Sequence, residues 1–131
     1  MYLLDTNTCI FIKNGKPPHV LQRLQEVIKK KVYVSSITLA ELQYGVYNSQ
    51  NIEKNRISLT EFIAPFSLLN FDDNDAEEFG KIRSYLKQNG IIIGPYDMLI
   101  AAQAISKNLV LVTNNTGEFS RIKNLKIEDW K

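Results

Sequence analysis

The chain has 131 residues and a formal net charge of +2, with 44% hydrophobic and 23% charged residues. These values are typical of a single globular domain, which we place at residues 1–131, and they allow a nucleic-acid partner without requiring one. No apolar run approaches the roughly 20 residues of a membrane span, and no basic segment precedes an apolar one at the N-terminus. We therefore expect an unprocessed cytoplasmic protein without membrane contact.

The chain lacks the side chains of several common catalytic mechanisms. A single cysteine, Cys9, excludes an internal disulfide and a cysteine-rich zinc site, and its apolar neighbours indicate a packed thiol. The one histidine, His19, follows two prolines, and no serine lies in a Gly-x-Ser-x-Gly setting. Ser-His-Asp, Cys-His and two-histidine ribonuclease chemistry are therefore poorly supported.

Strands and helices are expected to alternate along the chain. Short apolar or β-branched runs predict strands at residues 2–4, 32–35, 66–71, 109–113 and, at an edge, 125–127. Helical spacing and helix-ending residues predict helices at about residues 6–13, 20–28, 38–48, 51–64, 75–89 and 95–107. The last helix is apolar nearly all round and should be buried. This alternation predicts an α/β protein, a three-layer α/β/α sandwich with a mainly parallel central sheet.

An acidic stretch at residues 72–78 has two interpretations. It resembles a metal cluster, but acidic residues are also common in the first turn of a helix. There they accept hydrogen bonds from free backbone N–H groups and offset the macrodipole. We interpret this stretch as the capped start of the helix at 75–89.

Three other carboxylates stand where strands end and helices start. Asp5 follows the first strand, Glu41 lies just after the second, and Asp97 lies in the first turn of the buried helix. Oxygen ligands without histidine or cysteine suit a hard cation such as Mg²⁺ or Mn²⁺. Structural roles are open too, since Glu41 completes a Thr-x-x-Glu capping box with Thr38 and Asp97 suits the helix dipole. Asp5 is the hardest to explain structurally, because a central strand end has no need of a charge.

Around these carboxylates the chain resembles the PIN domain, and more narrowly the VapC ribonuclease toxins of bacterial toxin–antitoxin pairs. The resemblance extends from the first residue to Trp130, and four segments in the family's order carry it. They are Leu3-Leu4-Asp5-Thr6-Asn7, Ser35-Ser36-Ile37-Thr38-Leu39-Ala40-Glu41-Leu42, Ile93-Gly94-Pro95-Tyr96-Asp97-Met98-Leu99-Ile100-Ala101-Ala102 and Leu111-Val112-Thr113-Asn114-Asn115.

The resemblance implies a PIN-like fold and a Mg²⁺-dependent endoribonuclease, with Mn²⁺ as a possible substitute. Asp5, Glu41 and Asp97 would be its metal-binding and catalytic residues. Its substrate would be structured RNA such as a tRNA, cut to leave a 5′-phosphate and a 3′-hydroxyl.

Three secondary candidates also follow from the resemblance. Thr6 would help to orient the site. The family often has a fourth acidic residue after the fourth strand, where this chain has Asn115, with Glu118 a few residues on. An amide is a neutral oxygen ligand, so this departure weakens a second metal position and not the first.

The resemblance further implies two partners, a VapB-like antitoxin whose C-terminal segment crosses the active-site crevice and a second copy of the chain in a homodimer. The helix at 38–48 offers modest support, because its large apolar residues exceed what one short helix needs for a core. These residues, which are also candidates for the core, are Leu42, Tyr44, Val46 and Tyr47.

Three other functions compete with that of a toxin. A PIN nuclease of RNA processing would share the same motifs. Asp5-Thr6-Asn7-Thr8 partly matches the Asp-x-Asp-x-Thr loop of haloacid-dehalogenase-like phosphatases, but the second aspartate is missing. A receiver-like signalling module needs an acceptor aspartate after the third strand, where Asp72-Asp73 lie. It also needs a lysine after a later strand, and none follows the strand at 109–113 until Lys123.

Overall fold

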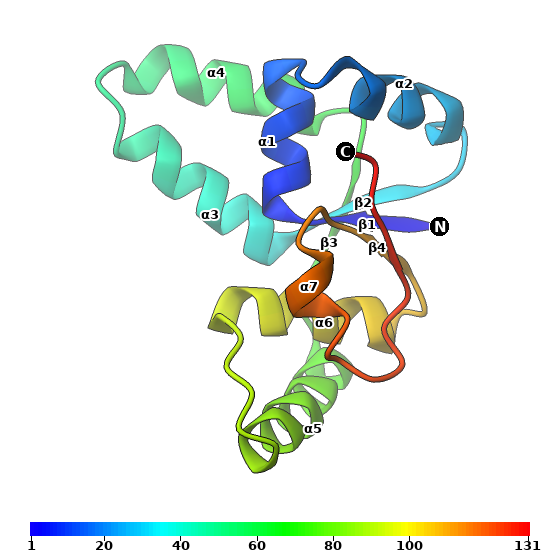
Figure 1. Ribbon diagram of the computed structural model, residues 1–131. Helices are drawn as coiled ribbons and strands as arrows, with labels where there is room; N and C mark the ends of the chain where they lie inside the picture. Colours follow the sequence, from blue (N-terminus) through cyan, green and yellow to red (C-terminus); the bar gives the residue numbers. More distant parts are fainter.

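The computed structural model describes residues 1–131, in which strands and helices alternate (Figure 1). The strands are β1 (Tyr2–Leu4), β2 (Val32–Ser35), β3 (Ser67–Leu69), β4 (Val110–Val112) and β5 (Ile127–Glu128). The helices are α1 (Thr6–Asn14), α2 (Pro18–Val27), α3 (Ser36–Tyr47), α4 (Ile52–Ile63), α5 (Asp73–Gln88), α6 (Pro95–Ser106) and α7 (Thr116–Phe119).

The strands form one sheet of five in the order β3-β2-β1-β4-β5, and every pairing is parallel. Strand β1 is central, with Leu3 opposite Tyr33 of β2 and Leu111 of β4. Leu3 and Leu4 have no exposed surface. Their apolar run does not alternate because both faces of a parallel sheet are covered.

Helices cover both faces of the sheet, which confirms the predicted three-layer α/β/α arrangement (Figure 1). Leu3 packs into a core with α5 and α6, whereas Leu4 packs on the opposite face with α1 and α2. The two leucines reach different cores because successive side chains of a strand point to opposite faces. Cys9 of α1 is fully buried in the second core, which confirms the packed thiol.

Helix α6 is fixed beneath the sheet by a buried polar side chain as well as by its apolar surface. Six of its twelve residues are buried, all from Met98 onward, whereas Pro95 and Tyr96 at its start are exposed, so the prediction of a buried helix holds for its middle only. The buried residues include Gln103, which has no exposed surface. The Gln103 side-chain oxygen accepts a hydrogen bond from the Ser35 hydroxyl, and its Nε2 donates to the Leu69 carbonyl over 3.2 Å. These contacts join α6 to the carboxyl ends of β2 and β3. They therefore hold Asp97, in the first turn of α6, near the ends of these strands.

Helix α3 begins at Ser36, two residues before the predicted start. Ser35 is its N-cap, and the Ser35 hydroxyl oxygen accepts the Ile37 backbone N–H over 2.9 Å. The predicted capping box of Thr38 and Glu41 is therefore wrong, because both residues lie inside the helix. Glu41 has no capping role.

The acidic stretch at 72–78 is a helix cap, as interpreted from the sequence. Asp72 accepts the Asp75 backbone N–H over 3.0 Å, and Asp75 accepts the Asp72 backbone N–H over 2.9 Å. Lys107 Nζ lies 2.5 Å from Asp72 Oδ2 and 3.2 Å from the fully buried Asp75 Oδ1. Asp72 is thus occupied by the cap and by Lys107, which argues against its use as a receiver-type phosphoryl acceptor.

Several boundaries and surfaces differ from expectation. Strand β3 is shorter than predicted, β5 lies further along the chain, and the single-turn α7 was not predicted, since four residues are too few to show periodicity.

Val46 is buried and Leu42 packs against the core, so only Tyr44 and Tyr47 remain as exposed apolar surface on α3. No helix has the length and apolar character needed to cross a membrane.

Candidate active site

The carboxyl ends of the three central strands meet at one edge of the sheet. Strands β2, β1 and β4 are neighbours and run parallel, so the residues that follow them gather there. Asp5 follows β1, helix α3 follows β2, and Thr113 follows β4. We call this side of the molecule, where Asp5 and Glu41 of α3 follow the strands, the acidic edge.

Asp5 has a structural role that sequence reasoning overlooked. It is the N-cap of α1, and its Oδ1 accepts the Thr8 backbone N–H over 2.8 Å. The side chain is only 4% exposed, and burial raises its pKa while hydrogen bonds from Thr113 and Thr8 oppose the rise. A charge after a central strand therefore does have a structural reason. The cap also fixes the carboxylate rigidly at the acidic edge.

Glu41 is oriented by Thr6. The Thr6 hydroxyl donates to Glu41 Oε1 over 2.7 Å and lies 3.1 Å from the hydroxyl of Thr38, a buried residue of α3. Thr6 opens α1 and Glu41 lies in the middle of α3, so this contact joins the helices that follow β1 and β2. Glu41 is half-buried, and this hydrogen bond holds its carboxylate at the acidic edge.

Asp97 is the carboxylate most affected by its neighbours. Burial raises its pKa to about 6, and the charges of Glu118, Asp5 and Glu41 add to the rise in that order. Carboxylates perturb one another in this way only when they lie close together. The structure thus brings the three predicted carboxylates into one electrostatic neighbourhood, and Glu118 with them.

Glu118 is held beside Asp97 by two hydrogen bonds. Its Oε2 accepts from Asn115 Nδ2 over 2.5 Å, and its Oε1 accepts the Gly94 backbone N–H over 3.3 Å. Gly94 is next to this group, because a Cβ atom there would lie 3.8 Å from Asp97 Oδ2. Asn115 therefore acts as a donor to Glu118, and Glu118 is the fourth carboxylate of the acidic edge.

The donor set has the chemistry of a site for a hard divalent cation, although no three acidic, histidine or cysteine side chains are arranged in this structure so that they could hold a metal ion. All candidate ligands are carboxylate or amide oxygens, which suit such a cation. A further oxygen, Asn114 Oδ1 after β4, is buried without a hydrogen-bond partner. Asp5 Oδ1, Glu41 Oε1 and both Glu118 oxygens are instead held by hydrogen bonds, so ligation would require some of these bonds to rearrange.

Sequence reasoning missed two contributors to the acidic edge. Asn114 directly precedes the candidate amide Asn115, and its buried oxygen is visible only in three dimensions. Gly94 supplies a backbone N–H to Glu118, although the residues lie far apart in sequence. The segment Thr113-Asn114-Asn115 was a usable signal, because polar residues directly after a buried strand reach the same edge as Asp5.

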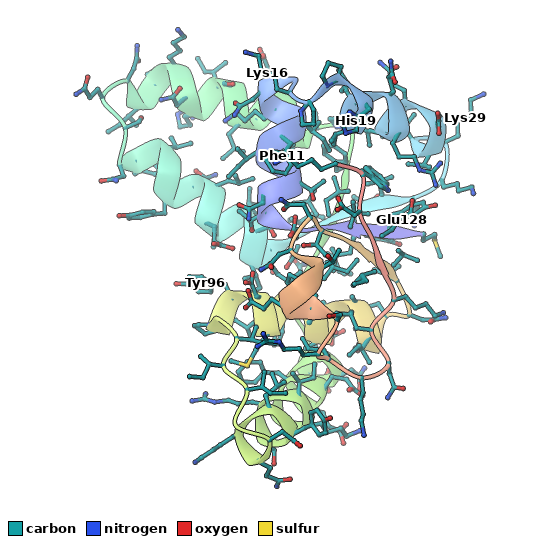
Figure 2. All side chains as sticks on the ribbon, in the orientation of Figure 1. Phe11, Lys16, His19, Lys29, Tyr96 and Glu128 are labelled. Atoms are coloured by element: carbon teal, nitrogen blue, oxygen red, sulfur yellow. The ribbon has the colours of Figure 1, made fainter.

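Two hollows open on either side of Glu41. One is a polar cleft of about 570 Å³ between α1, α3 and α4, lined by residues that include Thr6, Asn7 and Lys13. The other is an apolar trough of about 470 Å³ lined by Ile37, Ala40, Glu41, Tyr44 and Tyr96. Tyr96 stands out from the start of α6 (Figure 2).

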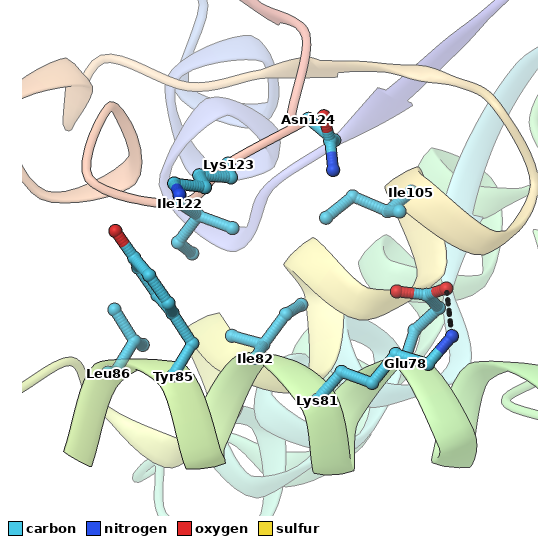
Figure 3. Close-up of a pocket in the computed structure, with 9 residues that line it drawn as sticks. All are labelled: Glu78, Lys81, Ile82, Tyr85, Leu86, Ile105, Ile122, Lys123 and Asn124. Carbon is cyan, nitrogen blue, oxygen red and sulfur yellow. Dashed lines mark ion pairs between the residues drawn. The ribbon is translucent and has the colours of Figure 1, made fainter. Parts of the chain in front are cut away.

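A separate cavity of about 200 Å³ lies between α5, the end of α6 and residues 122–124 (Figure 3). Lys123 Nζ stands 5.0 Å from the ring centre of Tyr85, and Lys81 pairs with Glu78 over 3.6 Å. None of the acidic-edge carboxylates lines this cavity.

Comparison with known proteins places the chain in one family. The family model described as PIN domain matches residues 2–125. The tRNA(fMet)-specific endonuclease VapC of Salmonella typhimurium is 43% identical over 98% of this chain and 97% of its own length. Ribonuclease VapC2 of Rickettsia felis is 42% identical over 99% of this chain and 98% of its own length.

Solved structures agree with this result. VapBC2 from Rickettsia felis, bound to a DNA fragment from its promoter, matches with a TM-score of 0.94 at 41% identity and covers 99% of this chain and 98% of the matched chain. DNA-bound VapBC from Salmonella typhimurium also matches with a TM-score of 0.94, at 43% identity over 99% and 98% of the two chains.

The chain is a parallel α/β/α sandwich with carboxylates at the acidic edge, and the PIN-domain family model matches nearly all of it. The chain belongs to the PIN-domain family and, within it, to the VapC ribonucleases. Nucleases of this kind generally depend on a divalent metal ion.

Proposed function

We propose that the chain is a Mg²⁺-dependent endoribonuclease that cuts structured RNA and acts as the toxin of a toxin–antitoxin pair. Asp5, Glu41 and Asp97 would be its metal-binding and catalytic residues. One observation carries this proposal: the pKa of Asp97 is raised by burial and, in addition, by carboxylates from three other segments of the chain. Charges that repel one another in this way are costly unless a cation or a proton offsets them.

Asp5, Asp97 and Glu41 would hold the ion, with Glu118, Asn115 and Asn114 close by. A bound Mg²⁺ ion would supply positive charge for the scissile phosphate and lower the pKa of a water molecule. The protein's own groups have separate tasks. Thr6 orients Glu41, the N-terminus of α1 fixes Asp5, and Asp97 would accept the proton released by the attacking water.

We also propose a tRNA substrate and a VapB-like antitoxin. One 43% identical relative is named for cleavage of tRNA(fMet), and several matched structures are VapBC complexes. Initiator tRNA is therefore the first substrate to test. A homodimer remains part of the proposal, and light scattering at micromolar concentration would test it.

A cleavage assay on initiator tRNA tests the nuclease mechanism. We expect cleavage with Mg²⁺ or Mn²⁺ and none in excess EDTA. Asp97→Asn should abolish cleavage. Asp73→Asn is the matched control, because Asp73 also lies in the first turn of a helix but is exposed on α5. Undiminished cleavage in EDTA, or an active Asp97→Asn protein, would contradict the mechanism.

A second experiment separates a toxin from a PIN nuclease of RNA processing. Expression of the chain alone should arrest growth, whereas co-expression with the product of a small neighbouring gene for a DNA-binding antitoxin should restore it. Normal growth on expression of an active chain would favour the RNA-processing role.

A further inference from the structure

The apolar trough beside Glu41 is continuous with the acidic edge. On α3 its residues are Ile37, Ala40, Glu41 and Tyr44. Residues three and four apart share one face of a helix, so these four side chains form a single wall. Tyr96 of α6 forms the opposite wall and directly precedes Asp97 in the chain. The trough therefore contains one proposed catalytic carboxylate and adjoins a second.

Two aromatic rings stand at this trough without a partner in the chain. Tyr44 is 70% exposed and Tyr96 is 57% exposed. Neither ring belongs to the aromatic pairs of the structure, which are Tyr2 with Trp130 and Phe62 with Phe66. Tyr96 projects from the start of α6 on the side of the molecule that carries α3 (Figure 2). Burial in the fold does not explain these two residues.

We infer that Tyr44 and Tyr96 hold an unpaired nucleobase of the RNA next to the scissile phosphate, an inference that rests on the proposed ribonuclease function. A base has flat faces that stack on aromatic rings, and single-stranded RNA is commonly bound in this way. Ile37 and Ala40 supply an apolar floor, and the volume of about 470 Å³ lies within the roughly 300–1,000 Å³ of pockets for small organic groups.

The position of Glu41 favours a base over an apolar protein side chain. Its carboxylate accepts one hydrogen bond, from Thr6, and an apolar cover would desolvate it without supplying another donor. A nucleobase carries N–H groups on its edge that can donate to a carboxylate. The charged phosphate and the ribose would suit the acidic edge, once it holds the proposed cation, better than the apolar walls. Stacking in the trough requires a base outside a duplex, so the cut should fall in a loop.

Tyrosine variants and abasic RNA together test this inference. Tyr44→Ala and Tyr96→Ala should each lower kcat/KM by about 5- to 150-fold, the effect of losing one stacked base, mainly by raising KM. Tyr44→Phe and Tyr96→Phe keep the ring and should recover most of the activity that the Ala variants lose. Tyr47→Ala is the control, because Tyr47 is 61% exposed on the same helix but does not line the trough.

The decisive measurement uses RNA with one abasic residue, placed in turn on each side of the cut. At the position that stacks, the wild type should lose activity, and each Ala variant should lose less than the wild type, since part of the contact is already absent. If the Ala variants are less active than the wild type by the same factor on every abasic RNA as on intact RNA, the rings do not contact a base and the inference is wrong. If light scattering shows that this loss accompanies the dissociation of a dimer, the trough is an interface between copies instead.

A binding measurement separates failure of this inference from failure of the proposed function. Fluorescence anisotropy with a labelled single-stranded oligoribonucleotide in EDTA involves no cleavage. Weaker binding by both Ala variants, but not by Tyr47→Ala, supports the inference even if the substrate tRNA is misassigned. Cleavage by the wild type together with unchanged binding and cleavage by both Ala variants would overturn this inference and leave the nuclease assignment intact.

Discussion

Thr6 donates its hydroxyl hydrogen to Glu41 Oε1 over 2.7 Å, across 35 residues of sequence. The bond joins the first residue of the helix after β1 to the middle of the helix after β2. It fixes the direction of a carboxylate that would otherwise rotate freely on a helix surface, so its removal should affect catalysis more than folding.

Removal of the Thr6 hydroxyl should impair cleavage. A hydrogen bond to a charged group contributes about 1.5–3 kcal/mol, so Thr6→Val should lower kcat/KM by roughly tenfold or more if that energy is used to position Glu41. Thr6→Ser keeps the hydroxyl and should retain most activity. Steady-state kinetics on the same RNA would measure both effects, and a Val variant as active as the Ser variant would remove Thr6 from the site.

Neutralisation of Asp97 should stabilise the metal-free protein in a pH-dependent way. Its pKa is raised from 3.8 to about 6, first by burial and then by neighbouring carboxylates. The folded state therefore disfavours the ionised form, and this destabilisation is absent below the unfolded pKa and complete above the folded pKa. Asp97→Asn should increase the free energy of unfolding above pH 6, by an amount that shrinks as the pH falls toward about 4. Urea unfolding in EDTA would measure it, and a difference independent of pH would show that ionisation of Asp97 does not destabilise the fold.

Mg²⁺ should raise the melting temperature of the wild type through this same group. A ligand that binds only the native state stabilises it by about 2.7 kcal/mol at 100 times its Kd. Thermal melts should show a smaller rise for Asp97→Asn and an unchanged rise for Asp73→Asn. If Asp97 only offsets the helix dipole, its replacement would cost a few tenths of a kcal/mol and leave the response to Mg²⁺ intact.

Lys107 should be important for stability but not for cleavage. Its Nζ lies 3.2 Å from Asp75, which is fully buried, so Lys107→Met would leave that carboxylate without its cation. Breaking a buried pair costs about 3–5 kcal/mol, and the partial exposure of Lys107 should place the loss at the lower end of that range or below it. Lys81→Met is the control, because the more exposed Lys81–Glu78 pair at 3.6 Å should contribute less than about 1 kcal/mol. Equal losses in urea unfolding would show that the burial of Asp75 does not matter.

The sequence determined the features that depend on neighbouring residues. The unalternating run at Tyr2–Leu4 indicated a strand buried on both faces, and the apolar character of residues 95–107 indicated a buried helix. The order of strands and helices predicted a parallel α/β/α sandwich, because parallel strands need crossover connections. The acidic start of α5 was correctly interpreted as a cap, since capping acts within one helical turn.

Only the tertiary structure decided how the candidate site is arranged. The sequence suggested a capping box at Glu41 and no structural role for Asp5. The fold instead makes Asp5 the cap of α1 and bonds Glu41 to Thr6. It also places Glu118, from a helix too short to predict, among the carboxylates that raise the pKa of Asp97. These relationships follow from the strand order β2-β1-β4, which long-range packing sets and which no local pattern of residues encodes.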